Sequence, residues 1–383
     1  MMSKPRNLSS ERLPHDVVID ILTRLPVKSL IRFRCVSKSW YSTITDPIFI
    51  TKHLNLQLNK AKSLSSNNNH NGFLLYTHDN QLYTAACNGG PTLTLTEVSK
   101  LQIPFPVDHY MVDHCNGMFL IYGNRDALIY LWNPNIQKFK VLADGPNGFT
   151  LGLAYHCQNN DFKILKIVLN SIFNNNTRPR FEAKVYTLGT DLWRRIEFSV
   201  ESVPNLGSIL DIQYEPFLFF NRALHFMAYT WGENNTNNFI LSFDVNDEIF
   251  REIRLPENYL DGFIFAEQAV HRLVVFKGSL ALSVFGPTVD EDGEVLDKCD
   301  MWVLGQYGVV ESWKKKTVGF ERIKDFFGCT ESGQLLIIMS PGRMVSYDPE
   351  SLYENNIGIP SPNWMAYTTD LMESLVQIGR AHV

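Results

Sequence analysis

A repeated hairpin pattern limits, more than any other feature, what this chain can fold into. Each copy has an aromatic residue, a polar turn and a second strand-like run rich in aromatic and basic residues. The copies are LWNPNIQKFKVL (131–142), VYTLGTDLWRRIEF (185–198), SFDVNDEIFREIRL (242–255), WVLGQYGVVESWKKKTV (302–318) and SYDPESLYENNIGI (346–359). They recur about every 45 to 60 residues, the spacing of four-stranded β-propeller blades. The pattern therefore predicts an all-β region built from repeated units.

Short apolar runs precede these hairpins, and clusters of Gly, Asn, Asp and Pro separate them. The runs are residues 72–77, 117–123, 161–169, 223–229, 271–285 and 333–340. With residues 74–104 counted as an irregular first unit, the pattern gives about six units. We expect a closed β-propeller, and a single open β-sandwich is the alternative.

The first part of the chain has a helical period instead. Val18, Ile21, Leu22 and Leu25 have the spacing of one face of an amphipathic helix, which Pro26 ends. Acidic residues in its first turn suit the helix dipole. The sequence therefore predicts a small helical domain ahead of the β region.

Two shorter helices are expected to follow the first. One covers residues 27–35 and presents Leu30, and Ser37 can cap another in which Trp40 continues a stripe begun by Val36. Three helices this short cannot cover all of their apolar side chains by packing on one another. Their surplus stripe must be covered by the rest of the chain, as a helical cap, or by another protein.

Charge separates the same two parts of the chain. Residues 1–60 hold 10 Lys and Arg against 4 Asp and Glu, whereas the remainder holds 25 against 36. The basic residues alternate with apolar ones at helical spacing and few aromatic residues accompany them, so we expect no nucleic-acid binding. The two parts are expected to meet different partners.

Apolar runs and cysteines indicate the compartment. No apolar run reaches the roughly 18 to 20 residues that span a bilayer, and the polar N-terminus lacks a signal-peptide core. The six cysteines are scattered without a CxxC pair, which favours free thiols over disulfides or zinc. We expect a protein of the cytoplasm, the nucleus or both, without membrane attachment.

Two segments could suggest a metal or catalytic site. DHYMVDHC (108–115) combines two His, two Asp and a Cys, but it leads directly into a strand, so His109 and His114 are expected to be locally hydrogen-bonded turn residues. The acidic run 289–300 lacks the order of a calcium-binding loop and is expected to be a solvated loop. The sequence has no GxSxG, HExxH or phosphate-binding glycine loop. We expect no catalytic residues, metal or cofactor.

The N-terminal pattern LPHDVVIDILTRLPVKSLIRFRCVSKSWYSTITDPIF (13–49) resembles the F-box, with two Leu-Pro pairs and the segment CVSKSW. The resemblance implies a docking unit for the Skp-family adaptor of SCF ubiquitin ligases. An apolar centre ringed by Lys28, Arg32, Arg34 and Lys38 suits an acidic partner. The residues expected to bind the adaptor are Leu13, Pro14, Val18, Ile21, Leu22, Leu25, Pro26, Leu30, Val36 and Trp40.

A second resemblance covers the β region. HCNGMFLIYG (114–123), LWNP, VYTLGTDLWRRIE and MWVLGQYGVVESWKKKTVG are similar to the F-box-associated, kelch-like domain of plant F-box proteins. The S-locus F-box proteins of pollen belong to the same broad group. The predicted organisation is α+β and multidomain: a three-helix F-box at 8–50, a linker at 51–71 and a propeller-like domain at 72–376. The tail 377–383 is left unassigned.

Together the resemblances imply a non-catalytic substrate-recognition subunit of an SCF complex. The F-box would dock the Skp adaptor, and through it a cullin scaffold and a RING subunit, while the β domain holds a client protein. Two alternatives are an S-locus F-box protein that recognises S-ribonucleases and a Skp-binding protein that delivers no client for degradation. The sequence does not identify the client-binding residues.

The acidic run also suggests a character for the client. Acidic residues between Asp290 and Asp300 would steer a basic partner if they lie in exposed loops. The alternative is that these charges only keep a large β domain in solution.

Overall fold

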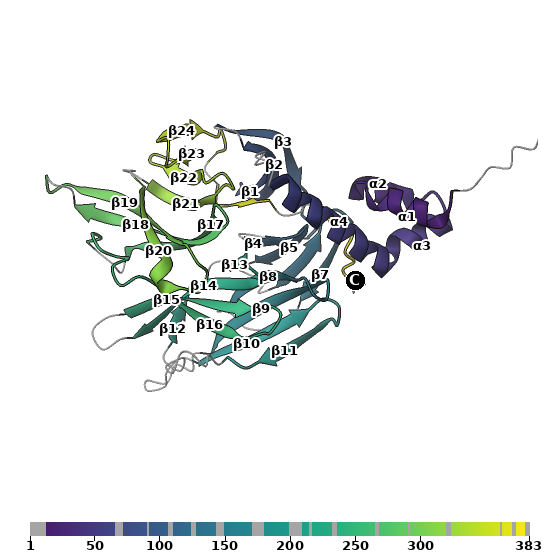
Figure 1. The fold of residues 1–383 in the computed structure, drawn as a ribbon, viewed down its shortest axis with the longest axis horizontal. Helices are drawn as coiled ribbons and strands as arrows, with labels where there is room; N and C mark the ends of the chain where they lie inside the picture. Colours follow the sequence, from purple (N-terminus) through teal and green to yellow (C-terminus); the bar gives the residue numbers. More distant parts are fainter. Residues whose placement is uncertain are drawn as a thin grey trace, which may run out of the picture.

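The computed structural model of the 383-residue chain describes residues 13–65, 72–89, 92–105, 110–123, 128–142, 149–170, 180–198, 209–213, 217–231, 236–264, 268–289, 292–318, 323–360, 362–369 and 373–379. Within these residues, helices near the N-terminus precede six antiparallel sheets that form a six-bladed β-propeller (Figure 1). The expected division into a helical unit and an all-β propeller is confirmed.

The first three helices lie where the sequence predicts, and a fourth follows them. They are α1 (His15–Thr23), α2 (Val27–Phe33), α3 (Lys38–Thr45) and α4 (Pro47–Ser65). The Ser37 hydroxyl accepts a hydrogen bond from the Trp40 amide at 3.1 Å, as expected of an N-cap. The Asp46 carboxylate caps α4 in the same way, accepting from the Ile48 amide at 2.7 Å. Each cap satisfies N–H groups that have no partner within the helix.

Residues 51–65, expected to belong to a linker, are helical and complete α4. The reason is that Ile50 and Leu54 lie one turn apart and are both buried, so that packing on one face outweighs the polar composition of the segment. The rest of the expected linker, 66–71, lies outside the described residues. Figure 1 shows α4 running from the propeller to the other three helices.

The strands of each blade follow sequence order, four to a blade except for five in the fourth, and the first blade is completed by the last strand, β25. The first three blades are β25 (Trp364–Thr368) with β1 (Gly72–His78), β2 (Gln81–Gly89) and β3 (Leu93–Leu101); β4 (Tyr110–Cys115), β5 (Met118–Gly123), β6 (Ile129–Asn133) and β7 (Lys138–Leu142); and β8 (Phe149–His156), β9 (Asp161–Asn170), β10 (Arg180–Thr187) and β11 (Leu192–Ile196). The ring closes because β25 pairs with β1, which explains why the first unit looked irregular in the sequence.

The other three blades follow the same plan. The fourth blade contains β12 (Ile209–Ile212) and β13 (Leu218–Phe220), which both pair with β14 (Ala223–Trp231), followed by β15 (Thr236–Asp244) and β16 (Phe250–Arg254). The fifth contains β17 (Val270–Phe276), β18 (Ser279–Val289), β19 (Val295–Leu304) and β20 (Trp313–Val318), with the 3-10 helix η3 (Val310–Ser312) before β20. The sixth contains β21 (Ile323–Cys329), β22 (Leu335–Met339), β23 (Arg343–Asp348) and β24 (Tyr353–Asn356). The first strands of neighbouring blades contact one another, for example β17 with β21 and β21 with β25.

The repeated hairpins are the third and fourth strands of blades two to six. Gln137, Asp191, Glu248 and Leu352 lie at the same place, just before the fourth strand, and all have a left-handed φ between 54° and 59°. The aromatic residue before the turn is buried, as Phe243 is at 1% exposure. The sequence repeat is therefore one tight turn plus one core aromatic residue per blade.

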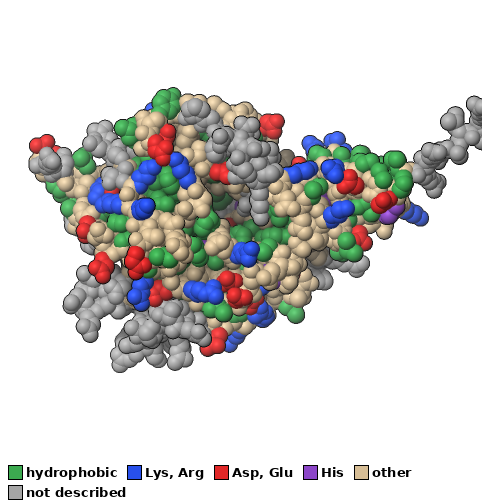
Figure 2. Space-filling view, in the orientation of Figure 1, with side chains coloured by type: hydrophobic (Ala, Val, Ile, Leu, Met, Phe, Trp, Pro, Cys, Tyr) green, Lys and Arg blue, Asp and Glu red, His purple; other side chains and the backbone are tan. Residues whose placement is uncertain are grey.

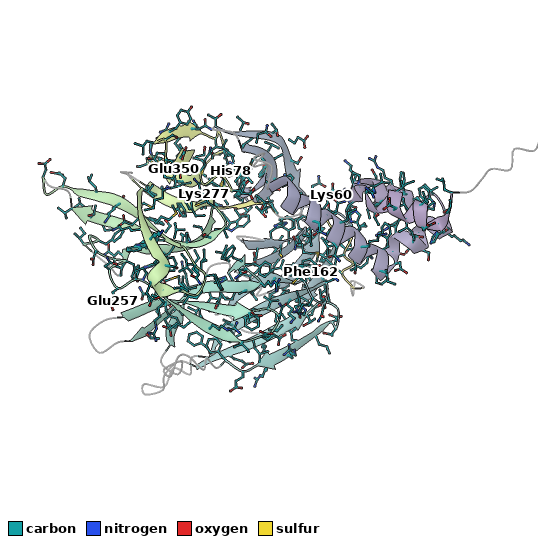
Figure 3. The ribbon with its side chains drawn as sticks, viewed as in Figure 1. Lys60, His78, Phe162, Glu257, Lys277 and Glu350 are labelled. Carbon is teal, nitrogen blue, oxygen red and sulfur yellow. The ribbon has the colours of Figure 1, made fainter. Side chains whose placement is uncertain are left out.

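The alternation of strand direction gives the propeller two different faces. Turns between the first and second strands, and between the third and fourth, open on one side, which we call the tight-turn face. Charged side chains link neighbouring blades there: Lys163 contacts Glu248 at 2.8 Å. Lys277 likewise contacts Glu350 at 2.6 Å, and both residues are labelled in Figure 3. Because β25 ends and β1 begins on this face, the helices adjoin it.

Candidate adaptor-binding surface

The four helices share a small apolar core. It contains Leu22, Val27, Leu30, Ile44, Phe49, Ile50 and, from the far end of the chain, Leu375. Burying one such side chain contributes roughly 1.5 to 3 kcal/mol to the free energy of unfolding. This core fixes the helices and thereby decides which apolar residues remain outside.

Leu22 and Leu30 were expected to bind a partner, but they are part of this core. Leu22 is 2% exposed and Leu30 is 0% exposed. An amphipathic stripe contains both residues that pack within the unit and residues that face outward, and the spacing alone does not separate them. Their assignment as contact residues is therefore corrected to that of core residues.

The other eight expected residues remain wholly or partly accessible. Leu13, Ile21 and Val36 are 60%, 46% and 63% exposed. Pro14 and Pro26 are exposed as well, and Val18, Leu25 and Trp40 are half-buried. Figure 2 shows hydrophobic side chains among basic ones on the helical unit, at the right of the view. Exposed apolar side chains gathered on one small unit are typical of protein–protein interaction surfaces.

Trp40 joins the core to this outer surface. Its ring packs edge-on against Phe33 with the centroids 5.2 Å apart, while the side chain keeps part of its area accessible. Half-buried Trp of this kind is a frequent anchor at interface centres, because one part is already fixed and the other is free to bind.

Three exposed apolar residues were missed from the sequence. Val17 is 38% exposed, Tyr41 56% and Ile48 80%. Val17 lies one turn before Ile21 on α1, a spacing that could have identified it. Ile48 gave no such signal, because it lies in the first turn of a helix that was not expected from the sequence.

Basic side chains accompany the exposed apolar residues. Lys28, Arg32 and Lys38 are exposed. Arg34 is half-buried, and among the described residues no acceptor is hydrogen-bonded to its Nε or Nη2 atom. Burial lowers the pKa of the Arg34 guanidinium, which nevertheless stays charged at neutral pH. A carboxylate from a partner would supply the missing acceptor.

The segment once considered for metal binding has a structural role. The Asp113 carboxylate accepts from the His114 amide at 2.7 Å and from the Leu153 amide at 2.6 Å, which connects β4 to β8. His114 lies in strand β4 and not in a turn, as was expected, but its hydrogen bonding is local: its Nε2 atom accepts from the Gly117 amide at 3.3 Å. His109 lies outside the described residues. Within the described ranges no group of three or more His, Cys, Asp or Glu side chains is placed to hold a metal.

The acidic run is only partly a loop. Strand β18 continues to Val289 and β19 begins at Val295, so the expected loop over 289–300 is confined to the residues between them, of which Asp290 and Glu291 lie outside the description. Asp300 is fully buried and forms ion pairs with Lys298 at 2.8 Å and Lys315 at 2.9 Å. The negative electrostatic field expected of the whole run is therefore too large, because the charge of Asp300 is neutralised by two lysines inside the blade.

Over the described part of the chain, no helix is both long and apolar enough to cross a membrane.

Comparison with known proteins agrees with this geometry. Residues 10–52 match the F-box domain, and residues 73–359 match the F-box associated beta propeller domain. An F-box/kelch-repeat protein of Arabidopsis thaliana is 25% identical over 319 residues, covering 80% of this chain and 79% of the relative. An F-box protein of the same organism is 26% identical, covering 92% and 89%. F-box protein CPR1, also of Arabidopsis thaliana, is 25% identical, covering 96% and 89%.

The helical unit with its accessible stripe, joined to a propeller, defines an F-box substrate adaptor. The chain belongs to the family of F-box proteins with an F-box associated beta propeller domain, and its relatives are plant F-box and F-box/kelch-repeat proteins.

Proposed function

We propose that the chain is the substrate-recognition subunit of an SCF ubiquitin ligase. Its helices would bind a Skp-type adaptor, which connects to a cullin scaffold and a RING subunit, and its propeller would hold a client protein. The observation that carries the proposal is the accessible apolar stripe on α1 and α3 beside exposed basic residues. An acidic partner with an apolar groove would complement both features.

The chain contributes proximity and no chemistry in this proposal. Two binding surfaces on one molecule raise the effective concentration of client lysines near the ubiquitin thioester. F-box proteins in general are non-catalytic adaptors, which supports this reading. Such a complex would act in the cytoplasm, the nucleus or both.

Adaptor binding is tested by placing a charge in the exposed stripe. Val36→Asp should reduce affinity for a recombinant plant Skp-type adaptor by roughly thirtyfold, because about 2 kcal/mol is a typical loss at an interface centre. Leu352→Asp is the matched control, since Leu352 is 69% exposed but lies on blade six. Isothermal titration calorimetry measures both variants beside the unchanged protein. Equal affinities for the three proteins would remove the basis of the proposal.

A further inference from the structure

The last described segment of the chain, residues 373–379, runs between the helical unit and the propeller, and we call it the C-terminal strap. Leu375 is 2% exposed and belongs to the core of the helices. Ile378, three residues later, is 1% exposed and belongs to a core cluster of blades two and three. One short segment therefore contributes to both cores.

Polar contacts connect the strap to both the helical unit and the propeller. The Glu373 carboxylate accepts a hydrogen bond from the Val27 amide at 2.8 Å, where α2 begins. Asn133, which is 0% exposed, donates from its Nδ2 atom to the carbonyl oxygens of Ser374 and Val376, both at 3.0 Å. Removing one partner of such a buried hydrogen bond leaves the other donor or acceptor without a partner, which destabilises the folded arrangement.

The propeller is shaped to receive the strap. Gly117, in the β4–β5 turn, has a φ of +78°, and a Cβ atom there would lie 2.9 Å from the Ser374 Cβ atom. The Asn133 side chain also shapes its own turn, since its Oδ1 atom accepts from the Asn135 amide at 3.0 Å. Two separate turns of blade two thus contact the same strap residue.

Helix α4 forms a second connection between the two parts. Leu54 is 3% exposed and lies in the same cluster as Ile378, with Leu58 packed beside it. Phe162, labelled in Figure 3, belongs to this cluster too. Because α4 and the strap approach the cluster as separate segments, the helical unit is attached at two points. Two attachments restrict rotation of the helical unit relative to the propeller more than the packing of α4 alone would.

We propose that the strap sets the orientation of the F-box relative to the propeller, with Asn133, Glu373 and Leu375 as positioning residues for ubiquitin transfer. The inference rests on the proposed function, since orientation matters only if the helices dock a ligase and the propeller holds a client. A fixed orientation limits which lysines reach the ubiquitin thioester, because proximity catalysis depends on geometry as well as on distance.

The strap is separable from closure of the propeller. Strand β25 ends at Thr368, before the strap, and its pairing with β1 involves residues 364–368 only. The helical core also retains six other buried side chains when Leu375 is changed. Variants in the strap should therefore loosen the connection while both parts stay folded.

The native cysteines allow a direct test on the full chain. Cys35 in the helical unit and Cys157 in the β8–β9 turn are exposed, whereas the other four cysteines are buried. Spin labels on these two thiols report one distance between the parts by double electron–electron resonance. The unchanged protein should give one narrow distance distribution, and Asn133→Ala or Leu375→Ala should broaden it at least twofold.

Matched controls separate this effect from general loosening. Asn355 also donates its amide to a backbone carbonyl, that of Leu93 at 2.7 Å, but within the propeller. Asn355→Ala and Leu375→Met should keep the narrow distribution. If Asn133→Ala fails to fold, Glu373→Ala carries the test, because it removes the acceptor of the Val27 amide. Distributions as narrow as that of the unchanged protein in all strap variants would overturn the proposal.

The second readout is the pattern of ubiquitin transfer. In a ligase reconstituted from adaptor, cullin, RING subunit and a conjugating enzyme, lysines of this chain modified in the complex are mapped by mass spectrometry. The unchanged protein should be modified at a restricted set, and strap variants with unchanged adaptor affinity at a wider set. An identical pattern despite a broadened distance distribution would also overturn the positioning role. Failure of the unchanged protein to bind the adaptor would instead refute the proposed function, and the label distances would still show whether the strap fixes the two parts.

Discussion

Lowering the pH should destabilise the propeller through its buried histidines. Burial lowers the pKa of His114 to about 3, and those of His225 and His271 to about 4. In the unfolded chain each ring titrates near 6.5. At pH values between the folded and the unfolded pKa, the unfolded state therefore binds more protons than the folded state. The free energy of unfolding consequently falls as the pH drops below about 6.5, and it continues to fall until the folded pKa values are reached.

The size of the effect follows from these values. For a ring with a pKa of about 4 in the folded state and about 6.5 in the unfolded state, the loss between pH 7.5 and pH 5 is about 2 kcal/mol. The three histidines together would remove about 6 kcal/mol, comparable to the whole stability of many domains. Ordinary carboxylates titrate mostly below pH 5, so this window isolates the histidines.

His271→Phe is the variant that tests the reasoning. Among the described residues, no hydrogen-bond partner reaches the His271 Nε2 atom, and its ring lies 5.6 Å from that of Tyr259, so an apolar ring fits the site. Urea unfolding followed by tryptophan fluorescence at pH 7.5 and pH 5 gives the pH-dependent loss for each protein. The loss should be about 2 kcal/mol smaller in the variant than in the unchanged chain.

The control changes a buried ring that cannot bind protons. Phe276→Leu, in the same blade as His271, should lower the free energy of unfolding at both pH values and leave the pH-dependent loss as it is in the unchanged protein. Equal losses in His271→Phe and the unchanged protein would show that burial of this ring does not couple to proton binding.

Two further predictions concern the connections of the propeller. A chain that starts at residue 72 lacks Leu54 and Leu58, so it should melt below one that starts at residue 47, as calorimetry of both would show; equal melting temperatures would contradict a packing role for α4. Glu248→Gln should lower the free energy of unfolding by about 2 kcal/mol in urea, because Lys163 and Arg194 lose their shared carboxylate, whereas Glu257→Gln, at an exposed site, should change it little.

The sequence predicted the parts of the fold that are local. In blades two, three, four and six, the turn before the fourth strand holds a left-handed residue with a buried aromatic residue within a few positions, so the pattern recurs visibly in the sequence. The second strands, such as β9 and β22, are short apolar runs that stand out for the same reason. Caps such as Ser37 depend on three residues at most.

What the sequence did not predict depends on contacts between distant residues. Strand β25 completes a blade whose other strands lie nearly 300 residues earlier, and no sequence pattern near Trp364 indicates that it pairs with β1. Whether Leu22 faces a partner or the core depends on Leu375, which covers the same cluster from the other end of the chain. The helical character of residues 51–65 similarly depends on packing of Leu54 against two blades.

The closure of the ring also explains how the helical unit comes to be held at two points. A first blade completed by the last strand makes β25 the innermost strand and β1 its neighbour, so the chain enters at Gly72 and leaves at Thr368 on the same face. The segment before β1 includes α4, and the segment after β25 includes the strap. Both therefore start from adjacent positions and reach the helices together, with Leu54 and Ile378 meeting in one cluster. The antiparallel pairing of β25 with β1 thus brings both ends of the propeller to the face that the helical unit adjoins.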